Sequence, residues 1–107
     1  MPKYLWRGSY SVEGTKGLIK DGGTKRRDSI ARLAESLGGK LESCYFAFGT
    51  DDLYLIYDMP DNASAAAGSL IVAGTGAVDG QTVVLMTPEE VDEATRKSGD
   101  YRIPGAG

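Results

Sequence analysis

The chain has 107 residues, of which 41% are hydrophobic and 25% charged, and its net charge is −3. Length and composition are those of one soluble globular domain, and the acidic balance argues against a nucleic-acid partner, because nucleic-acid binders carry a basic surplus. No apolar run approaches the ~18 residues of a membrane-spanning helix, so no membrane partner is expected.

The sequence contains no histidine and one cysteine, Cys44. This excludes histidine-ligated zinc and haem, the iron facial triad, and Ser-His-Asp or Cys-His catalysis. Any metal would have to be a hard cation bound by carboxylates, and any general base would be Asp, Glu, Lys or Tyr. We predict no metal site and no cofactor. One thiol forms no internal disulfide, and the N-terminus lacks the pattern of a signal peptide. We therefore expect a cytoplasmic protein in which Cys44 is a small buried side chain.

The N-terminal third predicts a strand followed by a helical crossover. Residues 3–10 are rich in aromatic side chains, which favours a strand. Residues 12–37 are expected to form a helix in two parts, capped by Ser11 and interrupted at Gly22-Gly23. The apolar face of the second part has the helical spacing i, i+3, i+4, i+7. It consists of Ile30, Leu33, Ala34 and Leu37.

Two strands follow, at residues 40–48 and 52–58. A tight turn of two residues at Thr50-Asp51, or of four at Gly49–Asp52, places Phe48 opposite Leu53. A three-residue loop would give a different pairing.

The C-terminal half predicts a helix, a strand and a second helix. Residues 63–72 form the first helix, capped by Asp61 or Asn62, and residues 81–86 form the strand. The second helix runs from Thr87 to about Lys97 and begins with a threonine cap, a proline and a capping-box glutamate at Glu90. We assign residues 1–98 to one domain and residues 99–107 to a flexible tail.

This order of elements predicts a ferredoxin-like βαββαβ sandwich, an α+β fold, with a C-terminal helix. Alternation then sorts the hairpin into two faces. One face carries Cys44, Phe46, Phe48, Leu53, Leu55 and Tyr57, and suits the underside of the helices. The other carries Ser43, Tyr45, Ala47, Asp52, Tyr54 and Ile56.

The second face carries more apolar side chains than a solvent-exposed face of a sheet usually does. A second copy of the chain would cover it, so we expect a dimeric α/β barrel, a homodimer or higher homo-oligomer. Arg7 is placed on this face, because burying it under helices would be costly.

Four residues are candidate ligand-binding groups in the space between two such sheets. Arg7 would hold a carboxylate or enolate, Tyr45 and Tyr54 would donate hydrogen bonds or stack, and Asp52 would sit at the mouth. Dimer packing is the alternative role for the same tyrosines. Asp51-Asp52 is also a candidate acid/base pair or cation site. A turn is the alternative role for these two residues, and the favoured one, since aspartate side chains bond nearby backbone N–H groups.

A second candidate is the start of the crossover's second helix. The stretch from Gly22 to Arg27 places Arg26 and Arg27 beside flexible backbone at a helix N-terminus, a possible anion-binding site. It lacks P-loop spacing. A solvated helix start, with an ion pair to a neighbouring subunit, is the alternative.

Several stretches resemble the GYD domain family, from residue 1 to about residue 98. They are Met-Pro-Lys-Tyr-Leu at the N-terminus, Leu37-Gly38-Gly39-Lys40-Leu41, and Phe48-Gly49-x-x-Asp52-x-Tyr-x-x-x-Asp-x-Pro60-Asp61. The resemblance implies a dimeric α/β barrel of the ferredoxin-like group, and many members of the family have no assigned function. Asp51 stands where the family motif usually has tyrosine, so no role of that tyrosine transfers to this chain.

Two functions remain open at this point. The chain is either a small homo-oligomeric domain that binds a small organic molecule or a protein partner, or a cofactor-free isomerase or monooxygenase for an aromatic or enolisable substrate. The sequence does not decide whether it is an enzyme, because related barrel families have diverse activities.

Overall fold

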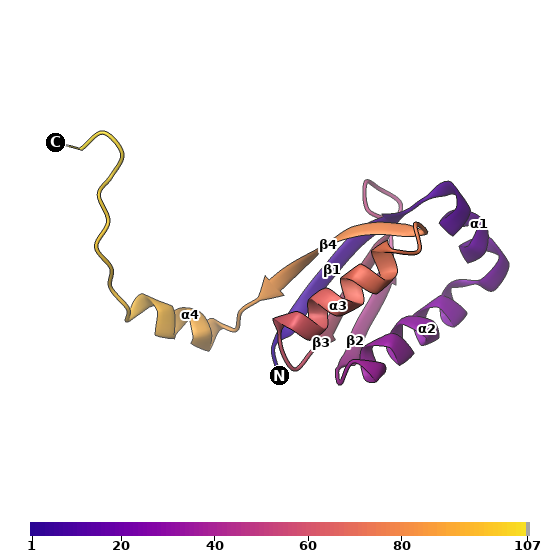
Figure 1. Ribbon diagram of the computed structural model, residues 1–107, viewed down its shortest axis with the longest axis horizontal. Coiled ribbons are helices and arrows are strands. Elements are labelled where there is room, and N and C mark those ends of the chain that lie inside the picture. Colours follow the sequence, from indigo (N-terminus) through magenta and orange to yellow (C-terminus); the bar gives the residue numbers. More distant parts are fainter. Residues whose placement is uncertain (107) are drawn as a thin grey trace.

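The computed structural model describes residues 1–106, which form one four-stranded antiparallel sheet and four helices. The elements are β1 (Lys3–Tyr10), α1 (Val12–Asp21), α2 (Gly23–Ser36), β2 (Lys40–Phe46), β3 (Leu53–Asp58), α3 (Asn62–Ala73), β4 (Val78–Leu85) and α4 (Pro88–Thr95). The strand order β2-β3-β1-β4 is that of a ferredoxin-like sandwich, so the predicted fold class is confirmed. In Figure 1 the sheet carries α2 over its β2 side and α3 over its β4 side.

The core lies between the sheet and the helices. Along β1, Tyr4, Trp6 and Gly8 are buried, whereas Arg7 is exposed on the opposite face. Tyr4 is the most deeply buried large side chain, with 1% of its surface exposed, and its ring stacks on Tyr57 with ring centres 5.6 Å apart. The alternation along this central strand therefore fixes which face of the sheet the helices cover.

The two-part crossover is confirmed. The hydroxyl of Ser11 accepts a hydrogen bond from the backbone N–H of Gly14 at 3.1 Å and caps α1. Gly22 separates the helices with a φ of 85°, a backbone conformation that L residues rarely adopt. The glycine therefore lets the chain leave α1 and enter α2 at once.

The hairpin differs from the prediction in its loop and register. β2 ends at Phe46 and β3 begins at Leu53, so the loop between them has six residues. Leu53 pairs with Phe46 and not with Phe48. The cause is a set of long-range bonds: the N–H of Asp52 donates to the carbonyl of Gly8 on β1 at 2.8 Å. Because the register moves by two residues, the strand residues keep their predicted faces. Phe48, by contrast, lies in the loop and is fully exposed.

The remaining elements follow local signals. Asp61 caps α3, accepting from the N–H of Ser64 at 2.8 Å. Thr87 and Glu90 form the predicted capping box of α4. The strand β4 begins at Val78, three residues before its predicted start, because it pairs with β1 along its whole length.

The segment from Met86 to Gly105, which we call the arm, stands away from the sandwich. Figure 1 shows α4 and the segment after it extending from the end of β4, and the molecule measures 60 Å along its longest axis. Every residue of the arm is exposed. The predicted flexible tail, residues 99–107, falls within the arm except for residues 106 and 107, and residue 107 lies outside the described residues.

Candidate functional site

The sheet surface opposite the helices, which we call the open face, brings together three of the four predicted ligand-binding residues. Strand pairing aligns its side chains in rows that cross the sheet. One polar row consists of Tyr45, Tyr54, Arg7 and Gln81, and the next, mainly apolar row of Ser43, Ile56, Leu5 and Val83. The open face therefore has an apolar middle with polar groups beside it.

Arg7 lies on the open face, as predicted, and both ends of its guanidinium are engaged. Its Nη1 donates to Oδ2 of Asp51 at 2.9 Å, and its Nη2 donates to Oε1 of Gln81 at 3.0 Å. The pair with Asp51 ties the hairpin loop to the sheet. Two of the five N–H groups through which arginine grips a carboxylate are thus already used within the chain.

Tyr54 lies directly between Arg7 and Tyr45 in this row. The Tyr54 side chain is 37% exposed and that of Tyr45 is 72% exposed. Two neighbouring phenol rings on a sheet form a surface on which a planar group can stack. The structure therefore brings three of the four predicted residues together.

Asp52, which we predicted at the mouth of the space between two sheets, is not a partner of the Arg7 guanidinium. Its carboxylate accepts the backbone N–H of Tyr10 at 3.1 Å, and its own backbone pairs with Gly8. It thus fastens the loop to the end of β1. Asp51 pairs with Arg7 instead.

A second polar group, centred on Lys3, borders the apolar row on the other side. The Lys3 ammonium donates to Asp58 at 2.9 Å and to Glu42, the bulge residue of β2, at 2.5 Å. The hydrogen bond to Glu42, and then that to Asp58, raises the pKa of Lys3. Lys3 is thus paired with acidic side chains, as Arg7 is with Asp51.

Arg26 and Arg27 differ in environment although they are adjacent. Arg27 is exposed and its guanidinium pairs with Asp28 at 3.2 Å. Arg26 is half-buried on the helix side and lines two cavities. Neither residue reaches the open face, so the two predicted sites are separate.

Cys44 is half-buried on the helix side of β2, and burial raises the pKa of its thiol, an effect that Arg27 partly offsets. Within residues 1–106, no three His, Cys, Asp or Glu side chains lie close enough together to hold a metal ion. None of the helices in that range has the length and apolar character needed to cross a membrane.

Two residues of the open-face group, Asp51 and Gln81, were not predicted. Gln81 on β4 is paired with Arg7 on β1. The alternation of side chains along β4, combined with antiparallel pairing to β1, could have predicted this position from the sequence. Asp51 gave no such signal, because its position depends on the length of the loop.

Comparison with known proteins gives one match. Residues 4–95 match the family model of the GYD domain, which covers most of the chain and confirms the resemblance seen in the sequence. No curated protein and no solved structure matches the chain significantly.

Proposed function

Because this chain belongs to the GYD domain family, we propose that it works as a cytoplasmic homodimer whose two open faces pack together and hold a small organic molecule between them. The resemblance to dimeric α/β barrels points in this direction. The residues of the open face supply the physical argument.

The composition of the open face carries the proposal. Its middle row contains Leu5, Ile56 and Val83, and Val83 is 39% exposed. The two central cations on either side, Arg7 and Lys3, are each paired within the chain, Arg7 with Asp51 and Lys3 with Asp58 and Glu42. A second sheet can therefore cover the apolar row without leaving Arg7 or Lys3 buried and unpaired, which is the main cost of burying ions.

The arm supports self-association as well. Its helix α4 has eight residues, and isolated helices of this length are marginal in water. Apolar side chains at Val91, Tyr101 and Ile103 are 48%, 76% and 67% exposed. A second subunit would give them a surface to cover.

A binding role fits Arg7 better than catalytic turnover does. A cofactor-free isomerase or monooxygenase would need a free cation or base at the reacting atoms. Asp51 and Gln81 already occupy Arg7. The exposed rings of Tyr45 and Tyr54 instead offer stacking to a planar molecule held between the sheets.

Sedimentation velocity of matched charge variants tests the dimer. We expect the wild-type chain to sediment at twice its 11.3 kDa mass at micromolar concentration. Val83→Glu should shift it to monomer with an unchanged circular dichroism spectrum. Leu70→Glu, at a 73% exposed position on the outside of α3, should remain dimeric. A monomeric wild type, or equal effects of both variants, would contradict the proposal.

Thermal-shift measurements with phenols and aromatic carboxylates test the ligand. A member of this panel should stabilise the wild-type dimer, and Tyr54→Leu should remove that shift. A panel without effect on the wild type, or a shift that survives in Tyr54→Leu, would exclude a ligand at these rings.

A further inference from the structure

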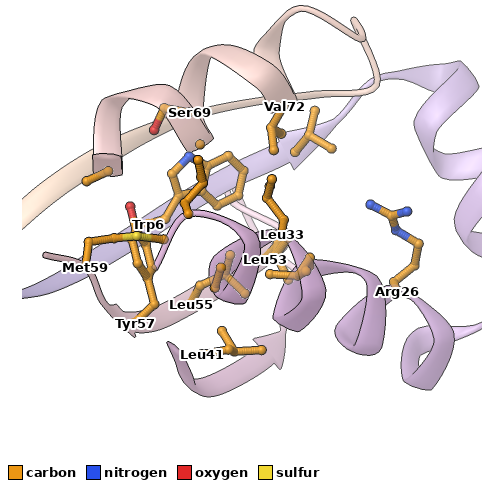
Figure 2. Close-up of a pocket in the computed structure, with 16 residues that line it drawn as sticks. Trp6, Arg26, Leu33, Leu41, Leu53, Leu55, Tyr57, Met59, Ser69 and Val72 are labelled. Atoms are coloured by element: carbon orange, nitrogen blue, oxygen red, sulfur yellow. The ribbon is translucent and has the colours of Figure 1, made fainter. Parts of the chain in front are cut away.

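A narrow apolar cavity lies on the opposite side of the sheet, between α2, α3 and the central strands (Figure 2). Its volume is about 70 Å³. Trp6, Leu53 and Leu55 line it from the sheet, Leu33 from α2 and Val72 from α3. An engineered apolar cavity of about 150 Å³ takes up benzene, so this smaller one suits a short alkyl chain better than a fused ring system.

Arg26 stands at one end of this apolar lining, as Figure 2 shows. It also lines a second, more polar cavity of about 240 Å³ between α1, α2 and the end of β1. The two acids there have lysine partners: Glu13 lies 3.5 Å from Lys16, and Asp21 lies 4.0 Å from Lys25. Within residues 1–106 Arg26 itself has no ion-pair partner.

Tyr10 lines the same cavity. Its hydroxyl oxygen is fully buried beside the Arg26 guanidinium, yet no hydrogen bond of normal geometry reaches it in the described part of the chain. Burial raises the pKa of Tyr10, and the nearby Arg26 guanidinium offsets part of the rise. A buried hydroxyl without a partner is rare in native proteins and is usually satisfied by a water or a ligand.

We propose that this is a binding site for a small carboxylate with a short alkyl chain. The carboxylate accepts hydrogen bonds from Arg26 and from the Tyr10 hydroxyl, and the chain enters the apolar cavity beside Trp6. One guanidinium near two acidic side chains suits a monoanion better than a doubly charged phosphate. The site is independent of the proposed dimer, since it uses the helix side of a single chain.

Trp6 supplies the readout, because it is the only tryptophan, is 7% exposed and lines the cavity. Hexanoate is the probe, titrated while Trp6 emission and the heat of binding are recorded, with 1-hexanol as the uncharged match. Hexanoate should bind saturably and change the Trp6 emission. Arg26→Gln should weaken hexanoate binding about tenfold, the loss of a charge-assisted hydrogen bond, and should leave hexanol unaffected.

Two further variants sharpen the assignment. Tyr10→Phe should weaken hexanoate severalfold, since it removes one neutral hydrogen bond. Arg27→Gln is the matched control. It removes the same charge from the neighbouring residue, whose side chain pairs with Asp28 and lines neither cavity. It should leave hexanoate binding unchanged. Val83→Glu, which disrupts the proposed dimer, should also bind hexanoate normally.

Three results would overturn the inference. The first is no change in Trp6 emission or heat with millimolar hexanoate. The second is equal weakening by Arg26→Gln and Arg27→Gln, which indicates diffuse attraction to a basic surface. The third is hexanol binding as tightly as hexanoate, which means that the cavity selects no anion.

Discussion

Replacing Gly80 by alanine tests how the indole of Trp6 is seated. Gly8 on β1 and Gly80 on β4 are paired on neighbouring strands, and the Trp6 ring lies over both of them. A Cβ at position 80 would lie 2.5 Å from the Arg7 carbonyl oxygen and 2.7 Å from Cε2 of Trp6. The added methyl must displace the indole. This costs free energy, because neither a backbone carbonyl nor a buried ring moves freely.

The magnitude follows from two opposing terms. Overpacking a core typically costs about 1–3 kcal/mol, while replacing glycine by alanine restricts the unfolded chain and returns about 0.4–1 kcal/mol. The net loss is roughly 1–2 kcal/mol, which lowers the Tm of a domain this size by about 5–10 °C.

Thermal and urea unfolding, followed by Trp6 fluorescence, measures the effect. Gly17→Ala is the control, because nothing lies within 4 Å of the Cβ it would add and its position is inside α1. There the same substitution should stabilise by about 0.5–1 kcal/mol, from helix propensity. If Gly80→Ala is as stable as the wild type and leaves the Trp6 emission unchanged, the packing of the indole is not as described.

Three further predictions concern single features. Cys44 should react with iodoacetamide at least about tenfold more slowly in the native than in the unfolded chain near pH 8, because burial raises its pKa and limits access; equal rates would show an open thiol. The backbone N–H of Ser64 lowers the pKa of Asp61 in the folded state. The ionised Asp61 carboxylate therefore stabilises the fold above its unfolded-state pKa of about 3.9, and this stabilisation is lost as the pH falls through the lower folded-state pKa. Asp61→Ala should accordingly weaken the pH dependence of urea unfolding in acid, and an unchanged dependence would refute this. Truncation after Met86 should leave the sandwich folded but weaken the dimer, as measured by sedimentation over a concentration series; an unchanged dimer constant would show that the arm takes no part.

The elements with local causes were predictable from the sequence. Side chains at Ser11, Asp61 and Thr87 cap the helices that follow them, within three residues of the N–H groups they accept from. Arg7 was placed correctly because a single physical cost, that of burying a guanidinium under helices, decided its face. The face assignments of β2 and β3 survived a wrong register because the error was an even number of residues.

The details of the site depended on contacts that local patterns do not encode. The six-residue loop is held by bonds from Asp52 to Gly8 and Tyr10, more than forty residues away in sequence. These bonds decide that Asp51 rather than Asp52 meets Arg7. The pattern did contain one unused signal: Arg26 precedes Ile30 and Leu33 at i, i+4 and i+7, so it continues the apolar stripe of α2 toward its start.

Hydroxyl-radical footprinting at low and high protein concentration tests the central claim, that the open face is buried by a second copy. The account predicts that Tyr45, Tyr54 and Val83 become protected as the concentration rises, while Leu70 and Ile19 on the helix layer react equally at both concentrations. Protection that appears only on the helices, or nowhere, would contradict it.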